Sequence, residues 1–173
     1  MGSFHRDTAE STYTSDARSL TRGEWLLCTL HVERMRLIAM RGCQLIYRND
    51  QHGIRPLLEM IGSDPENSLR GASFADAVVG KASALLLALA GAAFVATDLL
   101  SDAAAELLTQ QGVPFYGRRR VAQIAGLVPG QPCPFEQSVR SVEEPGEALR
   151  VLVALNERLI AMQRQGSRHG PQD

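Results

Sequence analysis

Residues 77–90 have Ala, Val or Leu at almost every position. Such a stretch favours a helix that is buried on all sides. Asp76 stands directly before it as a candidate N-cap, and Gly91 directly after it suits the left-handed residue that often ends a helix. We therefore predict a core helix that starts at Asp76, with Gly80, Lys81 and Ser83 as its informative exceptions.

Shorter patterns surround this predicted helix. Two β-prone runs on either side of Arg41-Gly42 predict a hairpin, and the apolar run AAFVAT predicts a central strand. The polar residues between the hairpin region and the core helix predict a loop over 62–73. Strands are expected at 36–40, 43–48, 92–97 and 113–116, and further helices at 24–34, 53–61, 101–111 and 145–163. Together they predict an α/β fold, a three-layer α/β/α arrangement around one mixed sheet.

The length of 173 residues predicts one domain over residues 23–163. Residues 1–22 are rich in Ser and Thr and poor in aliphatic side chains, so they cannot bury enough surface to offset their ordering entropy. Residues 164–173 are also polar. We expect both ends to be disordered tails.

The composition and net charge limit the classes of partner that we expect. The formal net charge of −1 gives no overall field that would attract nucleic acid or anionic lipid. The apolar run over residues 82–96 is shorter than the ~20 residues that a membrane crossing requires. Three scattered cysteines do not make a disulfide framework, which predicts a cytoplasmic location. We expect no nucleic-acid or membrane partner, a possible small-molecule ligand and a possible homo-oligomer.

Most enzyme signatures are missing from the sequence. There is no P-loop, no GxGxxG after a strand, and no HExxH, GxSxG or CxxC motif. Cys28 and His31 could share a helix face, but a packed cysteine and a surface histidine are the simpler interpretation. Cys43 is expected to be a small buried residue. Three consecutive arginines at 118–120 are usually solvated, with phosphate contact as the alternative.

Two candidate sites lie at predicted helix starts. Asp76 and Gly80 are four residues apart on one helical face, and Lys81 could border the same pocket. Ser101 and Asp102 begin a helix directly after the predicted central strand. The carboxyl ends of such strands are where open α/β sheets bind ligands, and helix N-termini there favour anions.

A third candidate is the loop that contains Cys133 and Glu136. Prolines on both sides of Cys133 would hold its thiol in one direction. Glu136 could cap the following helix or act on a proton. Lys81 nearby would stabilise the thiolate. The alternative is that Cys133 and its prolines only pack the loop onto the core.

These stretches resemble a small, uncharacterised prokaryotic domain-of-unknown-function family with a cytidine-deaminase-like fold that lacks the zinc site. The resemblance covers about residues 35–140. It rests on Leu37–Asp50 with the run GIRPLL, on DAVVGKASALL from Asp76, on Ser101 with Ala104 and Leu107, and on Cys133-Pro-Phe-Glu136.

The resemblance implies a three-layer domain in which the Asp76 helix replaces the zinc-binding helix of deaminases. Deaminases begin that helix with His-x-Glu or Cys-x-Glu and the next with Pro-Cys-x-x-Cys. The corresponding starts here are Asp-Ala-Val and Leu-Leu-Ser-Asp-Ala. Zinc and any other metal site are therefore not expected, and the cofactor is unknown.

Three functional hypotheses follow, and they leave open whether the protein is an enzyme. In the leading one, a non-zinc deaminase-fold domain binds a small anionic or nucleotide-like ligand. The ligand-binding residues would be Asp76, Gly80, Lys81, Ser101 and Asp102, and the catalytic candidates Lys81, Cys133 and Glu136. The first alternative is a Cys133-dependent transferase or sulfur carrier. The second is a non-catalytic regulatory or interaction protein that uses the amphipathic helix at 145–163 as its contact face.

Overall fold

The computed structural model describes residues 20–126, 128 and 130–166, so most of both predicted tails lies outside the described residues. Helix α1 begins at Arg22, and Thr21 forms a capping box with Glu24. Helix α6 continues to Gly166. Regular structure therefore extends slightly beyond both of the predicted limits at 23 and 163.

Eleven helices and strands follow one another along the described part of the chain. They are α1 (Arg22–Val32), β1 (Leu37–Arg41), β2 (Gln44–Asn49), α2 (Arg55–Gly62), β3 (Ser73–Val79), α3 (Lys81–Leu89), β4 (Phe94–Ser101), α4 (Asp102–Gln110), β5 (Phe115–Val121), α5 (Pro134–Ser138) and α6 (Pro145–Gly166).

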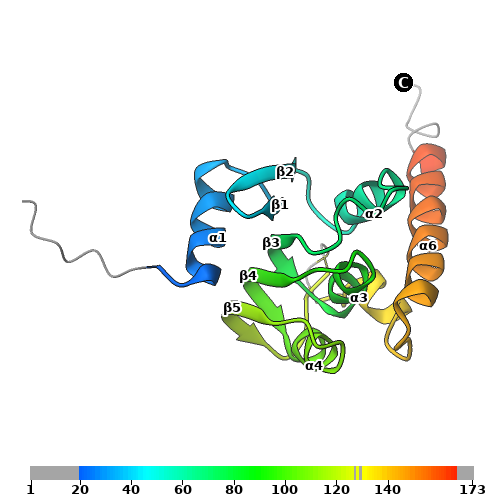
Figure 1. The fold of residues 1–173 in the computed structure, drawn as a ribbon. Helices are drawn as coiled ribbons and strands as arrows, with labels where there is room; N and C mark the ends of the chain where they lie inside the picture. Colours follow the sequence, from blue (N-terminus) through cyan, green and yellow to red (C-terminus); the bar gives the residue numbers. More distant parts are fainter. Residues whose placement is uncertain (1–19, 127, 129, 167–173) are drawn as a thin grey trace, which may run out of the picture.

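The five strands form one mixed sheet in the order β2-β1-β3-β4-β5. Strand β1 is antiparallel to both β2 and β3, whereas β3, β4 and β5 are parallel. Helix α1 covers one face of the sheet, and α2, α3 and α4 cover the other, with α6 packed outside them (Figure 1). The predicted α/β class, the mixed sheet and the three-layer arrangement are confirmed.

The predicted start of the core helix is wrong. Asp76 lies within strand β3, which also includes Ser73 from the expected loop, and helix α3 begins only at Lys81. An apolar run does not by itself distinguish a strand from a helix. Pairing with β1 on one side and β4 on the other decides it, because a central strand places all its backbone groups in ladders. The C-terminal end is confirmed, since Gly91 has a φ of 69°.

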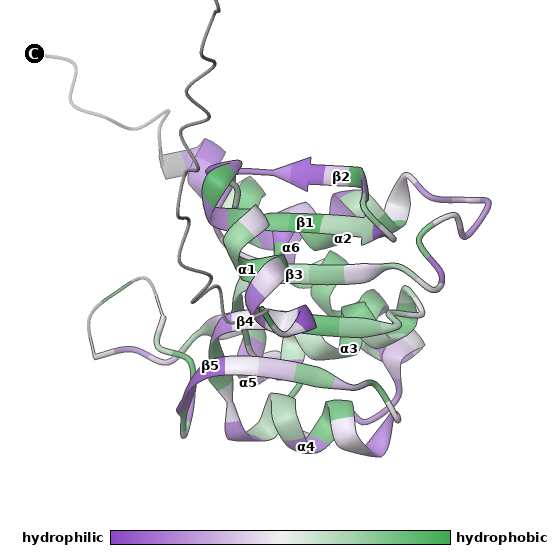
Figure 2. Ribbon diagram, turned by 60° about the vertical axis from the view of Figure 1, so that its left-hand side comes forward, coloured by the Kyte–Doolittle hydropathy of each residue, from purple (hydrophilic) through white to green (hydrophobic). Residues whose placement is uncertain are grey.

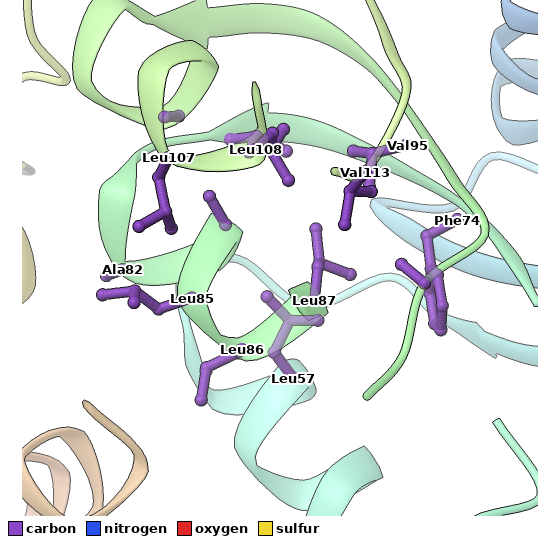
Figure 3. Close-up of a cluster of buried hydrophobic side chains, with 14 of the residues drawn as sticks. Leu57, Phe74, Ala82, Leu85, Leu86, Leu87, Val95, Leu107, Leu108 and Val113 are labelled. Atoms are coloured by element: carbon purple, nitrogen blue, oxygen red, sulfur yellow. The ribbon is translucent and has the colours of Figure 1, made fainter. Parts of the chain in front are cut away.

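The larger core lies between the sheet and the α3 layer. Side chains from α3, α4 and the parallel strands meet there, among them Phe74, Leu86, Leu87, Val95 and Leu108 (Figure 3). A smaller cluster on the other face joins α1 to the sheet. Strand β1 is largely hydrophobic, whereas the edge strand β2 is largely hydrophilic (Figure 2). The sheet is therefore buried at its centre and polar at that edge.

Two cysteine predictions need correction. Cys43 is exposed, because it lies in the turn between β1 and β2 and not inside a strand. Cys28 is also exposed, on the solvent side of α1. The hairpin itself is confirmed, with Gly42 in the turn at a φ of 57°. Because both thiols face solvent, neither contributes to the core.

Candidate functional site

A pocket of about 660 Å³ opens on the α3 side of the sheet. Its walls come from the ends of β1 and β3, the start of α2, the loop that precedes α5, and the second half of α6. This volume is in the range of small-molecule sites. Four of the predicted site residues line it: Asp76, Gly80, Cys133 and Glu136.

Asp76 is the polar group on the strand side of the pocket. It is half-buried in β3, opposite Leu37 of β1, and its Oδ1 accepts the N–H of Val78 at 3.2 Å. Burial raises the pKa of Asp76 to about 7, although the Val78 N–H and the positive charge of Arg36 act in the opposite direction. The carboxyl group can therefore donate or accept a hydrogen bond near neutral pH.

Glu136 caps helix α3 from a distant part of the chain. Its Oε2 accepts the N–H of Lys81 at 2.8 Å, and its Oε1 accepts the N–H of Ala82 at 2.9 Å. A carboxylate at this position satisfies two free N–H groups and interacts favourably with the helix dipole. Gly80 is required here, because a Cβ atom at that position would collide with the Glu136 carboxylate.

The Lys81 side chain is directed away from the pocket. Its Nζ donates to the carbonyl of Arg140 at 2.9 Å and to Glu143 Oε1 at 2.8 Å, and the side chain is 11% exposed. Lys81 is absent from the pocket lining. It joins α3 to the segment between α5 and α6, so the structure gives this ammonium group a structural role.

Ser101 and Asp102 also lie outside the pocket lining. Ser101 is the predicted N-cap of α4, which is confirmed, since its Oγ accepts the N–H of Ala104 at 3.1 Å. Asp102 accepts from Arg120 Nε at 2.7 Å. The structure therefore does not bring Lys81, Ser101 or Asp102 to the same pocket as Asp76.

Cys133 lies in the N-cap position of the short helix α5, between Pro132 and Pro134. It is half-buried and lines the pocket. The loop therefore places Cys133 on the same cavity as Asp76.

Several lining residues were not indicated by the sequence pattern. Arg36, His52 and Arg55 come from segments around β1 and the start of α2. Arg55 belongs to the run GIRPLL of the family resemblance, but no local motif marks any of the three as a site residue, because only the folded chain brings these segments beside β3. Asn156 of α6 also lines the pocket, and its signal was visible as a polar residue within the apolar stripe of that helix.

Comparison with known proteins places the chain. The model of the family described as "Domain of unknown function (DUF1893)", named TM1506, matches residues 27–155. The chain belongs to this family. The crystal structure of a DUF1893 family protein (TM1506) from Thermotoga maritima is similar, with a TM-score of 0.68 and 24% identity over 74% of this chain and 85% of that one. No curated protein matches the sequence.

The family segment contains the four predicted residues that line the pocket, but not all of its walls. The lining residues Asn156, Leu159, Ile160 and Gln163 follow the last matched position of the DUF1893 segment. The second half of α6 thus completes the pocket from outside the family segment.

The described residues lack the features of a metal site and of a membrane-spanning helix. No three His, Cys, Asp or Glu side chains among them converge as a metal ion would require. No helix within the described ranges has both the length and the hydropathy needed to cross a membrane.

Proposed function

We propose that this DUF1893 domain binds a small nucleotide-like ligand in the pocket beside Asp76, without zinc. The observation that carries the proposal is Asp76 itself. Among the described residues its carboxyl group has only a backbone hydrogen-bond partner, and it faces a cavity of about 660 Å³. A titratable group with a strongly shifted pKa in a pocket is a candidate functional residue.

The chemical character of the pocket walls favours a ligand with an apolar aromatic part and an anionic part. Most of the lining is apolar, which suits a flat aromatic body. Asp76 offers a polar contact at the strand floor. The exposed His52 and Arg55 lie where the chain enters α2. Arg55 Nε pairs with Glu59 Oε1 at 2.7 Å, so an anionic end such as phosphate would bind to His52 and to the terminal amino groups of Arg55.

The cytidine-deaminase-like fold is part of this proposal. In support, α3 and α4 both begin at the carboxyl ends of parallel strands, where the resemblance compares them with zinc-binding helices. The N-terminus of α3 already contacts the carboxylate of Glu136. The proposed ligand anion therefore binds at the α2 side of the pocket rather than at α3.

The experiment is titration of AMP, GMP, CMP and UMP into the protein by calorimetry, paired with thermal unfolding. We expect at least one of them to bind, and Asp76→Ala to weaken that binding by about tenfold or more. Asp102→Asn is the matched control, because Asp102 is an acidic residue outside the pocket. The proposal fails if no nucleotide binds, or if Asp76→Ala binds as well as the control.

Cys133 supports a second candidate function, covalent transfer chemistry. Its thiol lines the same pocket as Asp76, so a bound ligand would lie beside a nucleophile. Iodoacetamide labelling at pH 6 to 9, followed at Cys133 in a variant with Cys28→Ser and Cys43→Ser because those two thiols are exposed, tests this. Fast labelling at pH 6 that a bound nucleotide blocks would support covalent chemistry. A labelling rate that rises only near pH ~8.5, as for an ordinary thiol, would contradict it.

A further inference from the structure

Helix α6 has two halves with different surroundings. In the first half, Ala148 and Leu152 are fully buried in the core beside α3. In the second half, a stripe of side chains lines the pocket instead: Asn156, Leu159, Ile160 and Gln163. Their spacing of three, four and seven residues places them on one helical face. A stripe that would normally bury itself against another element therefore faces a cavity.

Asn156 is one of the two polar residues of that stripe, with Gln163 as the other. Asn156 is half-buried, and among the described residues its side-chain amide has no hydrogen-bond partner. A partly buried amide that lacks a partner costs free energy unless water or a ligand satisfies it. Leu159 and Ile160 beside it are also only partly buried. The amide is thus available to a molecule in the pocket.

Asn156 and Asp76 approach the pocket from different layers of the fold. Asp76 belongs to the sheet, whereas Asn156 belongs to the outer helix. A side-chain amide both donates and accepts hydrogen bonds, and the Asp76 carboxyl can do the same when it is protonated. A few polar groups in a mostly apolar pocket fix the orientation of a ligand and its specificity.

We propose that Asn156 is a specificity-determining residue. Its side-chain amide forms hydrogen bonds with the donor and acceptor atoms on the edge of a heteroaromatic ring that is bound between α6 and Asp76. The inference rests on the proposed function, since it concerns the same pocket. Leu159 and Ile160 cover the apolar face of the ring. Because Asn156 follows the segment that the DUF1893 model matches, the residue that selects the ligand lies outside that segment.

The test compares the affinities of CMP and UMP, whose rings present reversed patterns at one edge: an amino donor beside a ring-nitrogen acceptor in CMP, and a carbonyl acceptor beside a ring N–H donor in UMP. Calorimetry is performed on the full chain, on Asn156→Leu and on Asn156→Asp. Asn156→Leu is expected to weaken the preferred nucleotide by about tenfold and to remove most of the difference between the two. Asn156→Asp retains acceptors only and is expected to shift the preference towards CMP, whose amino group donates.

Met162→Leu is the matched control, because Met162 is on the same helix and 60% exposed. It should leave both affinities unchanged. If both Asn156 variants keep the CMP to UMP ratio of the unmodified protein, the inference is overturned while ligand binding stands. If neither these two nor AMP and GMP bind the unmodified protein, the proposed function falls, and the inference falls with it. Thermal unfolding of each variant establishes that it is folded.

Discussion

Two aspartates on neighbouring central strands occupy opposite faces of the same sheet. Asp98 of β4 is on the α1 face, where its Oδ2 lies 2.7 Å from His31 Nε2 and its Oδ1 lies 2.8 Å from Arg118 Nη1. Asp76 of β3 is on the pocket face, and within the described part of the chain its hydrogen-bond partner is one backbone N–H. Both carboxyl groups are partly shielded from water. Of the two, only Asp98 contacts basic side chains, those of His31 and Arg118.

The difference separates a structural carboxylate from a functional candidate. Asp98 links α1 and β5 to the centre of the sheet, so its charge is balanced within the fold. The pKa of Asp76 is raised because burial is only weakly compensated. A folded protein retains such a group at a cost in stability, and such costs are typical of binding and catalytic sites. Three substitutions test whether the two residues differ in this way.

Asp98→Ala should have the largest effect. It leaves His31 and Arg118 without their shared partner and removes the link between α1 and the sheet, so we expect a loss of about 1–2 kcal/mol in the free energy of unfolding. Urea denaturation at pH 7 measures it. A loss no larger than that of an exposed-pair variant such as Arg48→Gln would contradict the structural role of Asp98.

Asp76→Asn should increase the free energy of unfolding, in contrast to Asp98→Ala. Because the folded-state pKa of Asp76 is about 7 and its ordinary value is 3.8, this carboxyl group stabilises the fold fully below pH ~4 and loses that contribution as the pH rises to 7. The amide has no charge to bury and still accepts from Val78. At pH 8 we therefore expect the variant to be more stable by about 1 kcal/mol, after allowance for solvent around a half-buried group.

Urea denaturation of the unmodified protein and of Asp76→Asn, at pH 5 and at pH 8, measures that gain. The difference between the two proteins should grow with pH. Asp98→Asn is the control and should show no gain at pH 8. A difference that is the same at both pH values would mean that Asp76 is not a buried acid.

His31→Gln should have the smallest effect. The His31 side chain is 46% exposed, and exposed pairs contribute little, so we expect a loss of about 0.5 kcal/mol. A double-mutant cycle of His31→Gln, Asp98→Ala and the variant with both substitutions isolates the coupling free energy of the pair. A coupling free energy near zero would show that Arg118 alone balances Asp98.

The sequence predicted the outline of the candidate site better than its contacts. Asp76, Gly80, Cys133 and Glu136 do line one pocket. The prediction placed Asp76 and Gly80 on one helical face with the Cys133 loop beside them, whereas the structure brings them together with Asp76 in strand β3. Gly80 leaves room for the carboxylate of Glu136 to approach the start of α3. Lys81 could not be placed from its helix position alone, because its partners lie about sixty residues further along the chain.

Local patterns by themselves determined what depends on neighbours in the sequence. The hairpin at Gly42, the helix end at Gly91 and the Ser101 cap are such features, because backbone conformation and the first turn of a helix are decided within a few residues. Only the tertiary structure decided that Asp76 belongs to a strand. That choice depends on ladders with β1 and β4, and the pocket depends on α6 returning over them. Contacts between segments distant in the chain have no local signature, so composition and periodicity could not reveal them.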